Sequence, residues 1–313
     1  MSATLSKNTS LLKLNTGATI RAIGLGTWRS AAATDAYDSV IAALRAGYRH
    51  IDTAAIYGNE AEVGRAIRES GVPRGEIFVT TKLWCTQHKE PELALDQSLK
   101  RLGLDYVDLY LMHWPVRMRG ENMPEGDKIG FPTLPNGKRD IDITDWNFVK
   151  TWELMQKLPE TGKTRAIGVS NFSINNLKDL LASPGNKIVP AANQVEMHPL
   201  LPQQELVDFC HGKGIVIEAY SPLGSADAPI LKEPVIIEIA KKNGVSAAQV
   251  VISWNVQRGY IVLPKSVNKE RIEANLLTFT LTSEDFEAVN NISKVQGTKR
   301  IIDPDWEPFK PFV

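Results

Sequence analysis

The sequence predicts one (β/α)8 barrel, a TIM barrel, and three observations support this fold class. Short apolar strands alternate with helical segments along the chain, and such alternation requires parallel pairing through right-handed crossovers. Eight strand-helix units follow a short hairpin, and eight units close most naturally into a barrel. The chain has 313 residues, of which 43% are hydrophobic, and α/β barrels often reach this length as one domain.

A β-hairpin is expected ahead of the barrel, because residues 11–14 and 18–21 are short apolar segments that flank a turn containing Gly17. The barrel strands are recognised as short apolar runs. In chain order they are expected at residues 23–25, 48–51, 77–81, 107–112, 166–169, 192–196, 215–219 and 260–263.

The helices are recognised by apolar residues at helical spacing and by signals at their ends. Gly47 and Gly103 stand where helices should stop, Pro91 starts one, and Ser246 with Gln249 matches a capping box. The helices are expected at residues 35–46, 60–70, 91–102, 146–158, 174–182, 202–211, 234–243, 247–258, 269–275 and 283–293. Two of these, 247–258 and 283–293, are extra helices near the C-terminus.

Two segments have no regular pattern and are expected to lie over a pocket. Residues 115–145 form a long polar stretch rich in Pro and Gly, which suggests a lid or a pocket wall. Residues 302–313 form an irregular tail rich in Pro and aromatic residues. No repeat, low-complexity run or linker marks a second domain, so residues 1–313 are expected to form a single barrel domain.

Alternative folds and sites are disfavoured by single residues. An open dinucleotide-binding sheet would need a third glycine in the first βα turn, where Arg29 stands. A phosphate-binding Walker motif ending at residues 162–164 would need glycine at Lys157. Cys85 and His88 have a metal-like spacing without convincing further ligands, so no metal is expected.

Composition limits the partners and the compartment. Lys+Arg and Asp+Glu each number 36, so no global charge favours nucleic acid or an anionic membrane. Residues 1–10 lack the apolar core of a signal peptide, and no apolar run is long enough to span a bilayer. Cys85 and Cys210 do not form a disulfide framework. The cysteines therefore favour reduced thiols in a cytoplasmic protein, and a monomer is expected.

Four polar residues are expected to meet at one face of the barrel. Asp52, Lys82 and His113 end three successive strands, and Tyr57 follows the first of these in a short loop. The carboxyl ends of barrel strands share the face where chemistry occurs. Separately, the acid could cap a helix and the histidine could be a satisfied core group. Together, the four residues predict a catalytic cluster.

The ionisation of this cluster suggests general acid catalysis. A tyrosine has a reference pKa of about 10, which makes it a poor proton donor at neutral pH. We expect Lys82 to lower the pKa of Tyr57 and Asp52 to keep the ammonium charged and oriented. Neutral His113 could donate a hydrogen bond to the oxygen of a carbonyl substrate.

The second half of the chain offers groups that could hold a hydride donor. Ser170, Asn171 and Gln194 stand at strand ends and could bond a carboxamide, while Tyr220 could stack on a flat ring. Residues 263–266 and Arg271 open a helix, with two cations and a hydroxyl for a phosphate. A solvated helix start is the alternative interpretation of that last segment.

These segments resemble the aldo-keto reductase family over residues 13–308. The resemblance rests on residues 47–64, 107–115 and 163–172 and on Leu263-Pro-Lys-Ser with Arg271 and Asn275. Within that family the chain is most similar to yeast NADP-dependent glycerol dehydrogenases and carbonyl reductases. The resemblance implies NADPH-dependent reduction of aldehydes and ketones, reversible as alcohol oxidation, including that of glycerol.

The resemblance also implies a role for individual residues. Tyr57 is the expected proton donor, tuned by Asp52 and Lys82, and His113 orients the carbonyl. The residues expected to contact NADPH or NADP+ are Gly26, Thr27, Trp28, Ser170, Asn171, Gln194, Tyr220, Ser221, Leu223, Lys265, Ser266, Arg271 and Asn275. Family members often have glutamate three residues after the arginine, where this chain has Ala274, so the contact to adenine departs from the family pattern.

The expected substrate pocket is aromatic. Trp28, Trp84 and Trp114 match family positions that line the pocket, which suits an apolar or amphipathic carbonyl compound. A pentose reductase is a second interpretation, ranked lower because Val267 stands where such enzymes often have asparagine. A barrel that binds NADPH as a sensor or subunit, without turnover, is the alternative of another class.

Overall fold

The computed structural model describes residues 3–28, 34–121, 123–124, 126–225 and 227–313. Arg29, on which the argument against an open dinucleotide-binding sheet depended, lies outside the described residues. Within these ranges, none of the helices combines the length and the apolar character needed to cross a membrane.

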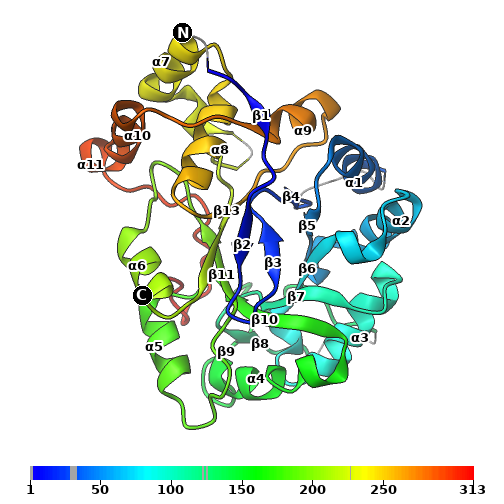
Figure 1. The fold of residues 1–313 in the computed structure, drawn as a ribbon. Helices are drawn as coiled ribbons and strands as arrows, with labels where there is room; N and C mark the ends of the chain where they lie inside the picture. Colours follow the sequence, from blue (N-terminus) through cyan, green and yellow to red (C-terminus); the bar gives the residue numbers. More distant parts are fainter. Residues whose placement is uncertain (1–2, 29–33, 122, 125, 226) are drawn as a thin grey trace.

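Eight parallel strands form the central sheet, as predicted (Figure 1). Their order is β13-β12-β11-β10-β7-β6-β5-β4. The strands are β4 Leu25–Gly26, β5 His50–Asp52, β6 Phe78–Leu83, β7 Val107–Met112, β10 Thr164–Ser170, β11 Ala192–Glu196, β12 Val216–Tyr220 and β13 Ile261–Leu263.

The first and last strands of this order meet and close the barrel. Ile23 forms a parallel bridge with Val262. The amide of Gly24 donates to the carbonyl of Val262 at 3.0 Å, and the amide of Val262 donates to the carbonyl of Ala22 at 2.8 Å. The closed arrangement confirms the barrel and excludes the open sheet.

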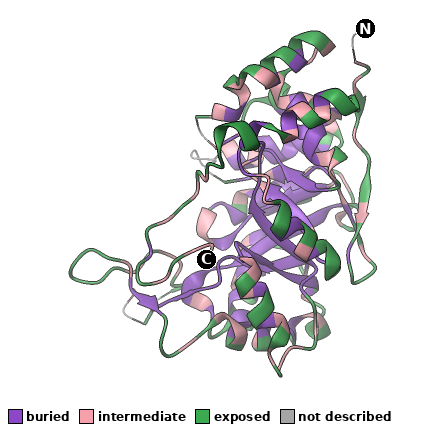
Figure 2. Ribbon diagram, turned by 90° about the vertical axis from the view of Figure 1, so that its left-hand side faces the viewer, coloured by how far each residue is buried: buried purple, intermediate pink, exposed green. Residues whose placement is uncertain are grey.

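Helices surround the barrel and present their outer faces to solvent (Figures 1 and 2). They are α1 Asp35–Ala46, α2 Glu60–Glu69, α3 Pro91–Leu102, α4 Phe148–Met155, α5 Ile174–Ala182, α6 Gln204–Gly212, α7 Pro234–Asn243, α8 Ala247–Gln257, α9 Lys269–Asn275, α10 Ser283–Asn290 and α11 Ile292–Gln296. The predicted capping box is present at α8, where Ser246 accepts from the amide of Gln249 at 3.2 Å.

The predicted hairpin packs against one end of the barrel and closes it. It consists of β2 Leu11–Lys13 and β3 Thr19–Arg21. Leu14 and Ile20 from this hairpin join one buried cluster with Leu109, Ala166 and Ile261 from the strands. With this end filled by apolar side chains, the opposite end of the barrel is left for polar groups.

Three local features differ from the sequence-based expectations. The loop 115–145 contains a small antiparallel sheet, β8 Arg117–Met118 with β9 Ile141–Asp142. The last expected helix, 283–293, is two helices, α10 and α11, which meet at Asn291. A further pair, β1 Ser6–Lys7 with β14 Leu277–Thr278, has no apolar pattern in the sequence and was not predicted.

Candidate active site

The structure brings the four residues of the predicted cluster together at the carboxyl ends of the strands. Asp52 ends β5, and His113 directly follows β7. Tyr57 ends the short 3-10 helix Ala55–Tyr57 after β5. Lys82 lies inside β6 rather than after it, since the strand continues to Leu83.

Lys82 links the acid to the phenol. Its Nζ donates to both carboxylate oxygens of Asp52 at 2.8 Å, to the carbonyl of Thr53 at 2.8 Å and to the hydroxyl of Tyr57 at 3.4 Å. The side chain of Lys82 is completely buried, whereas Asp52 and Tyr57 line a cleft of about 1090 Å3. The ammonium therefore reaches the cleft only through its contacts with Asp52 and Tyr57.

The pKa shifts in this group differ from the sequence-based expectation at one residue. Burial lowers the pKa of Lys82, but Asp52, Tyr57 and Glu218 together outweigh burial and raise that pKa. Burial, with the charge of Asp52, raises the pKa of Tyr57 by more than Lys82 lowers it. The expected net lowering is therefore wrong, because the cost of placing a phenolate among buried groups exceeds the attraction of the ammonium. Tyr57 holds its proton at neutral pH.

His113 follows β7, and its ring meets Tyr57, which follows β5 on the other side of β6. Its ring packs edge-on against Tyr57 at 5.8 Å between centroids and against Trp84 at 5.3 Å. Burial, reinforced by the charge of Lys82, holds the pKa of His113 well below its usual value. The imidazole is thus neutral, as expected, and can donate from one nitrogen only.

The amides and hydroxyls of the second half of the chain form one hydrogen-bond network that lines the cleft. Tyr220 donates to Asn171 Oδ1 at 2.7 Å, and Asn171 Nδ2 donates to the carbonyl of His113 at 2.9 Å. Ser170 donates to the carbonyl of Gln194 at 2.8 Å. Asn171 has a left-handed backbone with φ 63°, a conformation that asparagine tolerates better than most residues. The bond to His113 ties this network to the predicted catalytic cluster.

Glu218 is a site residue that the sequence analysis missed. The side-chain amide of Gln194 donates to Asp52 at 2.8 Å and to Glu218 at 2.7 Å, so one amide bridges two buried carboxyl groups. Burial and the charge of Asp52 raise the pKa of Glu218 to about 7. The available signal was an acid between Ile217 and Ala219 in an otherwise apolar strand.

The far end of the cleft is cationic. Lys265 and Arg271 line it together with other residues expected to contact NADPH. Burial lowers the pKa of Lys265, the charge of Asp35 partly offsets this, and the charge of Arg271 lowers it further. The expected contact residues that line the cleft are Gly26, Trp28, Ser170, Asn171, Gln194, Tyr220, Ser221, Leu223, Lys265, Ser266, Arg271 and Asn275.

Thr27 does not line the cleft, unlike the other residues in that set. Its amide and hydroxyl donate to the carbonyl of Asp52 at 3.1 and 3.0 Å. Thr27 therefore supports the strand end that carries Asp52. Ala274 lines the cleft, close in sequence to Asn275, where the family pattern has a carboxylate.

Aromatic side chains line the other end of the cleft. Trp28 packs edge-on against Tyr57 at 4.9 Å, and Trp114 packs against Trp306 of the tail at 4.7 Å. Trp84 packs against Phe131 of the loop 115–145 at 5.0 Å. Both irregular segments thus contribute side chains to the cleft wall.

Glu196, also missed by the sequence analysis, fastens the tail to the barrel. Its carboxylate accepts from the amides of Ile301 and Ile302, each at 2.8 Å. His198 bonds the same carboxylate at 2.8 Å, and both side chains are fully buried. Because Ile301 and Ile302 line the cleft, Glu196 sets the position of its wall.

Comparisons with known proteins agree with this geometry. The model of the aldo/keto reductase family matches residues 22–229 and 230–294. The chain is 69% identical over 312 residues to glycerol 2-dehydrogenase (NADP(+)) and 64% identical over 312 residues to the aldehyde reductase YPR1, both from Saccharomyces cerevisiae, with 100% of each chain covered. It is 49% identical over 290 residues to D-galacturonate reductase of Hypocrea jecorina, which covers 92% of this chain and 91% of that one.

Proposed function

The chain belongs to the aldo/keto reductase family, and from this premise we propose that it is an NADPH-dependent carbonyl reductase that converts aldehydes and ketones to alcohols. In reverse it oxidises alcohols, including glycerol. The names of two relatives over the full chain, glycerol 2-dehydrogenase (NADP(+)) and aldehyde reductase, support both the reaction and the cofactor. The single observation that carries the proposal is the position of Tyr57, whose hydroxyl lies in the cleft 3.4 Å from Lys82 Nζ and whose ring packs against His113.

The residues of the cleft fit NADPH. Lys265 lies close enough to Arg271 for the charge of Arg271 to act on it. Two neighbouring cations of this kind suit the binding of a phosphate group. Asn171 and Gln194 offer amides, and Tyr220 offers a ring whose hydroxyl is fixed by Asn171. When bound, the cofactor supplies the hydride for the carbonyl carbon.

In the proposed mechanism Tyr57 supplies the proton. Its phenol donates to the carbonyl oxygen as negative charge develops there, and Lys82 stabilises the phenolate that remains. Asp52 keeps the ammonium charged and in place. Neutral His113 donates a second hydrogen bond to the same oxygen, so the carbonyl is oriented by two donors.

The two alternatives have less support. A sensor or subunit that only binds NADPH would not need a buried Lys82–Asp52 pair directed at a phenol. A pentose reductase is a substrate variant of the same reaction, and it is ranked lower because Val267 follows Lys265 and Ser266 where pentose reductases often have asparagine. The relatives named above are themselves named for glycerol, aldehydes and D-galacturonate, which favours a broad carbonyl class.

We also propose a single-domain monomer located in the cytoplasm that acts without nucleic acid or membrane. The balanced charge of the sequence supports the last part of this proposal, since no global field favours nucleic acid or an anionic membrane. The two cysteines, Cys85 and Cys210, are buried free thiols, which suits a reducing compartment.

The test is Tyr57→Phe, assayed by the loss of NADPH absorbance with simple aldehydes and ketones. We expect turnover to be abolished while NADPH binding, measured by fluorescence, is preserved. Tyr37→Phe is the matched control, because Tyr37 lies on α1 and bonds Glu69 away from the cleft. Substantial reductase activity in Tyr57→Phe would reject the assigned proton donor.

A further inference from the structure

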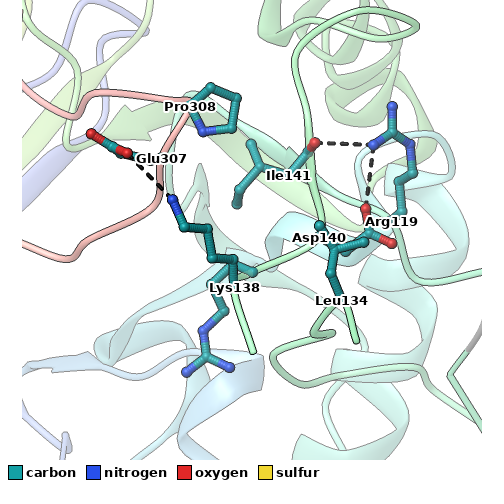
Figure 3. Close-up of a pocket in the computed structure, with 8 residues that line it drawn as sticks. Arg119, Leu134, Lys138, Asp140, Ile141, Glu307 and Pro308 are labelled. Atoms are coloured by element: carbon teal, nitrogen blue, oxygen red, sulfur yellow. Dashed lines mark hydrogen bonds and ion pairs between the residues drawn. The ribbon is translucent and has the colours of Figure 1, made fainter. Parts of the chain in front are cut away.

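Arg139 lies where the loop 115–145 meets the cleft. It lines the main cleft and also a second, smaller cleft of about 260 Å3 between the loop and the tail. Figure 3 shows the smaller cleft, with Lys138 directed to Glu307 of the tail and Arg119 bonded to Asp140 and to the carbonyl of Ile141. Arg139 is thus the loop residue shared by both spaces.

The neighbouring cations of this loop are neutralised by carboxylates. Arg117 pairs with Asp142 at 2.5 Å, and Arg119 pairs with Asp140 at 3.3 Å. Lys138 pairs with Glu307 at 3.5 Å. Arg139 differs, because no carboxylate of the described residues lies within ion-pair distance of its guanidinium.

Arg139 is nevertheless held in place. Its guanidinium carbon lies 4.8 Å from the centre of the Phe131 ring, and Nη1 donates to the carbonyl of Phe131 at 3.3 Å. A guanidinium stacked on an aromatic face keeps its outer N–H groups available to a planar anion. Less side-chain freedom is then lost when an anion binds.

A line of ring contacts connects Arg139 to the reacting end of the cleft. Phe131 packs on Trp84 at 5.0 Å, and Trp84 packs on His113 at 5.3 Å. Arg139 therefore lies on the same wall as His113, beyond two aromatic rings. A substrate whose carbonyl oxygen meets Tyr57 and His113 would extend along Trp84 and Phe131 towards this cation.

The other charges that line the cleft leave this cation as the anion-binding group at the aromatic end. Asp52 is neutralised by Lys82, and Lys265 with Arg271 belong to the far end. Asp303 of the tail also lines the cleft, and its charge acts on Arg300 of the same segment. The aromatic end of the cleft thus contains one cation, Arg139, which is positioned by Phe131.

We propose that Arg139 forms a carboxylate subsite, so that the preferred substrates include aldehydes and ketones bearing a carboxylate several atoms away from the carbonyl. This inference rests on the proposed reductase function. The guanidinium would bind the carboxylate through two parallel N–H groups, while the intervening part of the substrate packs on Trp84 and Phe131. A carboxylate directly bonded to the carbonyl would be too close to Tyr57 to reach Arg139.

The experiment compares two substrates that differ in charge and little in shape, 4-carboxybenzaldehyde and methyl 4-formylbenzoate. For each protein we take the ratio of kcat/KM for the acid to kcat/KM for the ester. Comparing this ratio between proteins cancels the intrinsic difference in carbonyl reactivity. Arg139→Met is expected to lower the ratio about 10-fold, as the loss of a charge-assisted contact predicts.

A second pair, 4-carboxycinnamaldehyde and its methyl ester, places the carboxylate farther from the carbonyl. Glyoxylate, whose carboxylate is bonded directly to the carbonyl, tests the shortest separation. We expect Arg139→Met to lower the ratio of acid to ester for this longer pair as well and to leave glyoxylate reduction unchanged. Lys138→Met is the matched control, since it removes the adjacent cation, which pairs with Glu307 outside the main cleft. Arg139→Lys keeps the charge and should retain part of the preference.

The outcomes separate the subsite from the reductase function. Equal ratios for wild type and Arg139→Met in both longer pairs, with the esters still reduced, overturn the carboxylate subsite alone. A parallel loss of acid and ester turnover in Arg139→Met also overturns it, because the residue would then act through structure. If the wild type reduces none of these aldehydes, the reductase function fails and the subsite with it.

Discussion

Lys82 places its ammonium 2.8 Å from each carboxylate oxygen of Asp52 and 3.4 Å from the hydroxyl of Tyr57. The side chains of Lys82 and Asp52 are only 0% and 5% exposed. Removing one partner of a buried ion pair leaves the other charge without compensation and costs about 3–5 kcal/mol. The Lys82–Asp52 pair beside Tyr57 is therefore also needed for the stability of the fold.

Lys82→Met and Asp52→Asn should each lower the free energy of unfolding by about 3 kcal/mol or more, whereas the double variant should lose less than the sum. Urea unfolding of the four proteins measures this coupling, and all three variants should lose turnover. Lys163 pairs with Asp96 at 2.7 Å on the surface, so Lys163→Met is the control and should cost less than about 1 kcal/mol. Additive losses in the buried pair would contradict the coupling.

Glu218 should make stability depend on pH in a particular direction. Its pKa is raised to about 7 in the folded chain from 4.5, so the folded state binds the extra proton between these values. The stability linked to this proton is fully present below about pH 4.5 and is lost as pH rises through about 7. A shift of this size corresponds to about 3 kcal/mol.

Glu218→Gln should remove this dependence, because the amide oxygen still accepts from Gln194 but cannot ionise. The variant should match the wild type near pH 5 and be more stable by up to about 3 kcal/mol near pH 8. Denaturant unfolding at a series of pH values measures the difference. Glu205→Gln, at an exposed position on α6, provides the control. A constant difference across this range would exclude the raised pKa.

Lys265 and Arg271 should determine the preference for NADPH over NADH. Lys265→Met and Arg271→Met are each expected to lower kcat/KM with NADPH about 10-fold and to change it little with NADH, because only NADPH has the extra phosphate. Lys269→Met is the control, since Lys269 lies on α9 with Arg271 and its side chain is 71% exposed beside Glu273. Wild-type enzyme that uses both cofactors equally well would refute this assignment.

Glu196→Gln should loosen the tail while sparing the catalytic cluster. The amide that replaces one carboxylate oxygen repels one of the backbone N–H groups of Ile301 and Ile302. We expect KM for aldehydes to rise several-fold, with little change in NADPH binding, and faster hydrogen exchange at both amides. Gln203→Ala is the control, because the side chain of Gln203 donates to the backbone carbonyl of Glu196 and accepts from Arg300, rather than bonding the carboxylate. Unchanged exchange at Ile301 and Ile302 would show that the carboxylate does not hold the tail.

The barrel could be predicted because each unit carries its own signal. Gly47, Gly103 and Ser246 mark helix ends by local backbone chemistry, and α1, α3, α7 and α9 begin and end where the sequence predicts. The pairing of Ser6 and Lys7 with Leu277 and Thr278 could not be predicted. Two polar residues show no alternation of apolar and polar positions, and their partner strand lies near the other end of the chain.

The site could be predicted where a residue stands at a strand end, as Asp52 and His113 do. Glu218 and Glu196 were missed because an acid within an apolar strand indicates burial only when its partners are known. Those partners are the side chain of Gln194 from the next strand and the amides of Ile301 and Ile302 from the tail. The pKa of Tyr57 was predicted in the wrong direction, since sequence shows the neighbouring Lys82 but not the depth of the phenol.

The bridge between Ile23 and Val262 also has a consequence for how the protein folds. The strand that seals the barrel is synthesised near the end of translation, and the bond from Gln194 to Asp52 spans 142 positions. Contacts so distant in sequence carry a loop-closure entropy that slows folding. The nascent chain therefore exposes the unpaired edge of β4 on the ribosome until its last strand emerges, and during that interval it is most prone to aggregation.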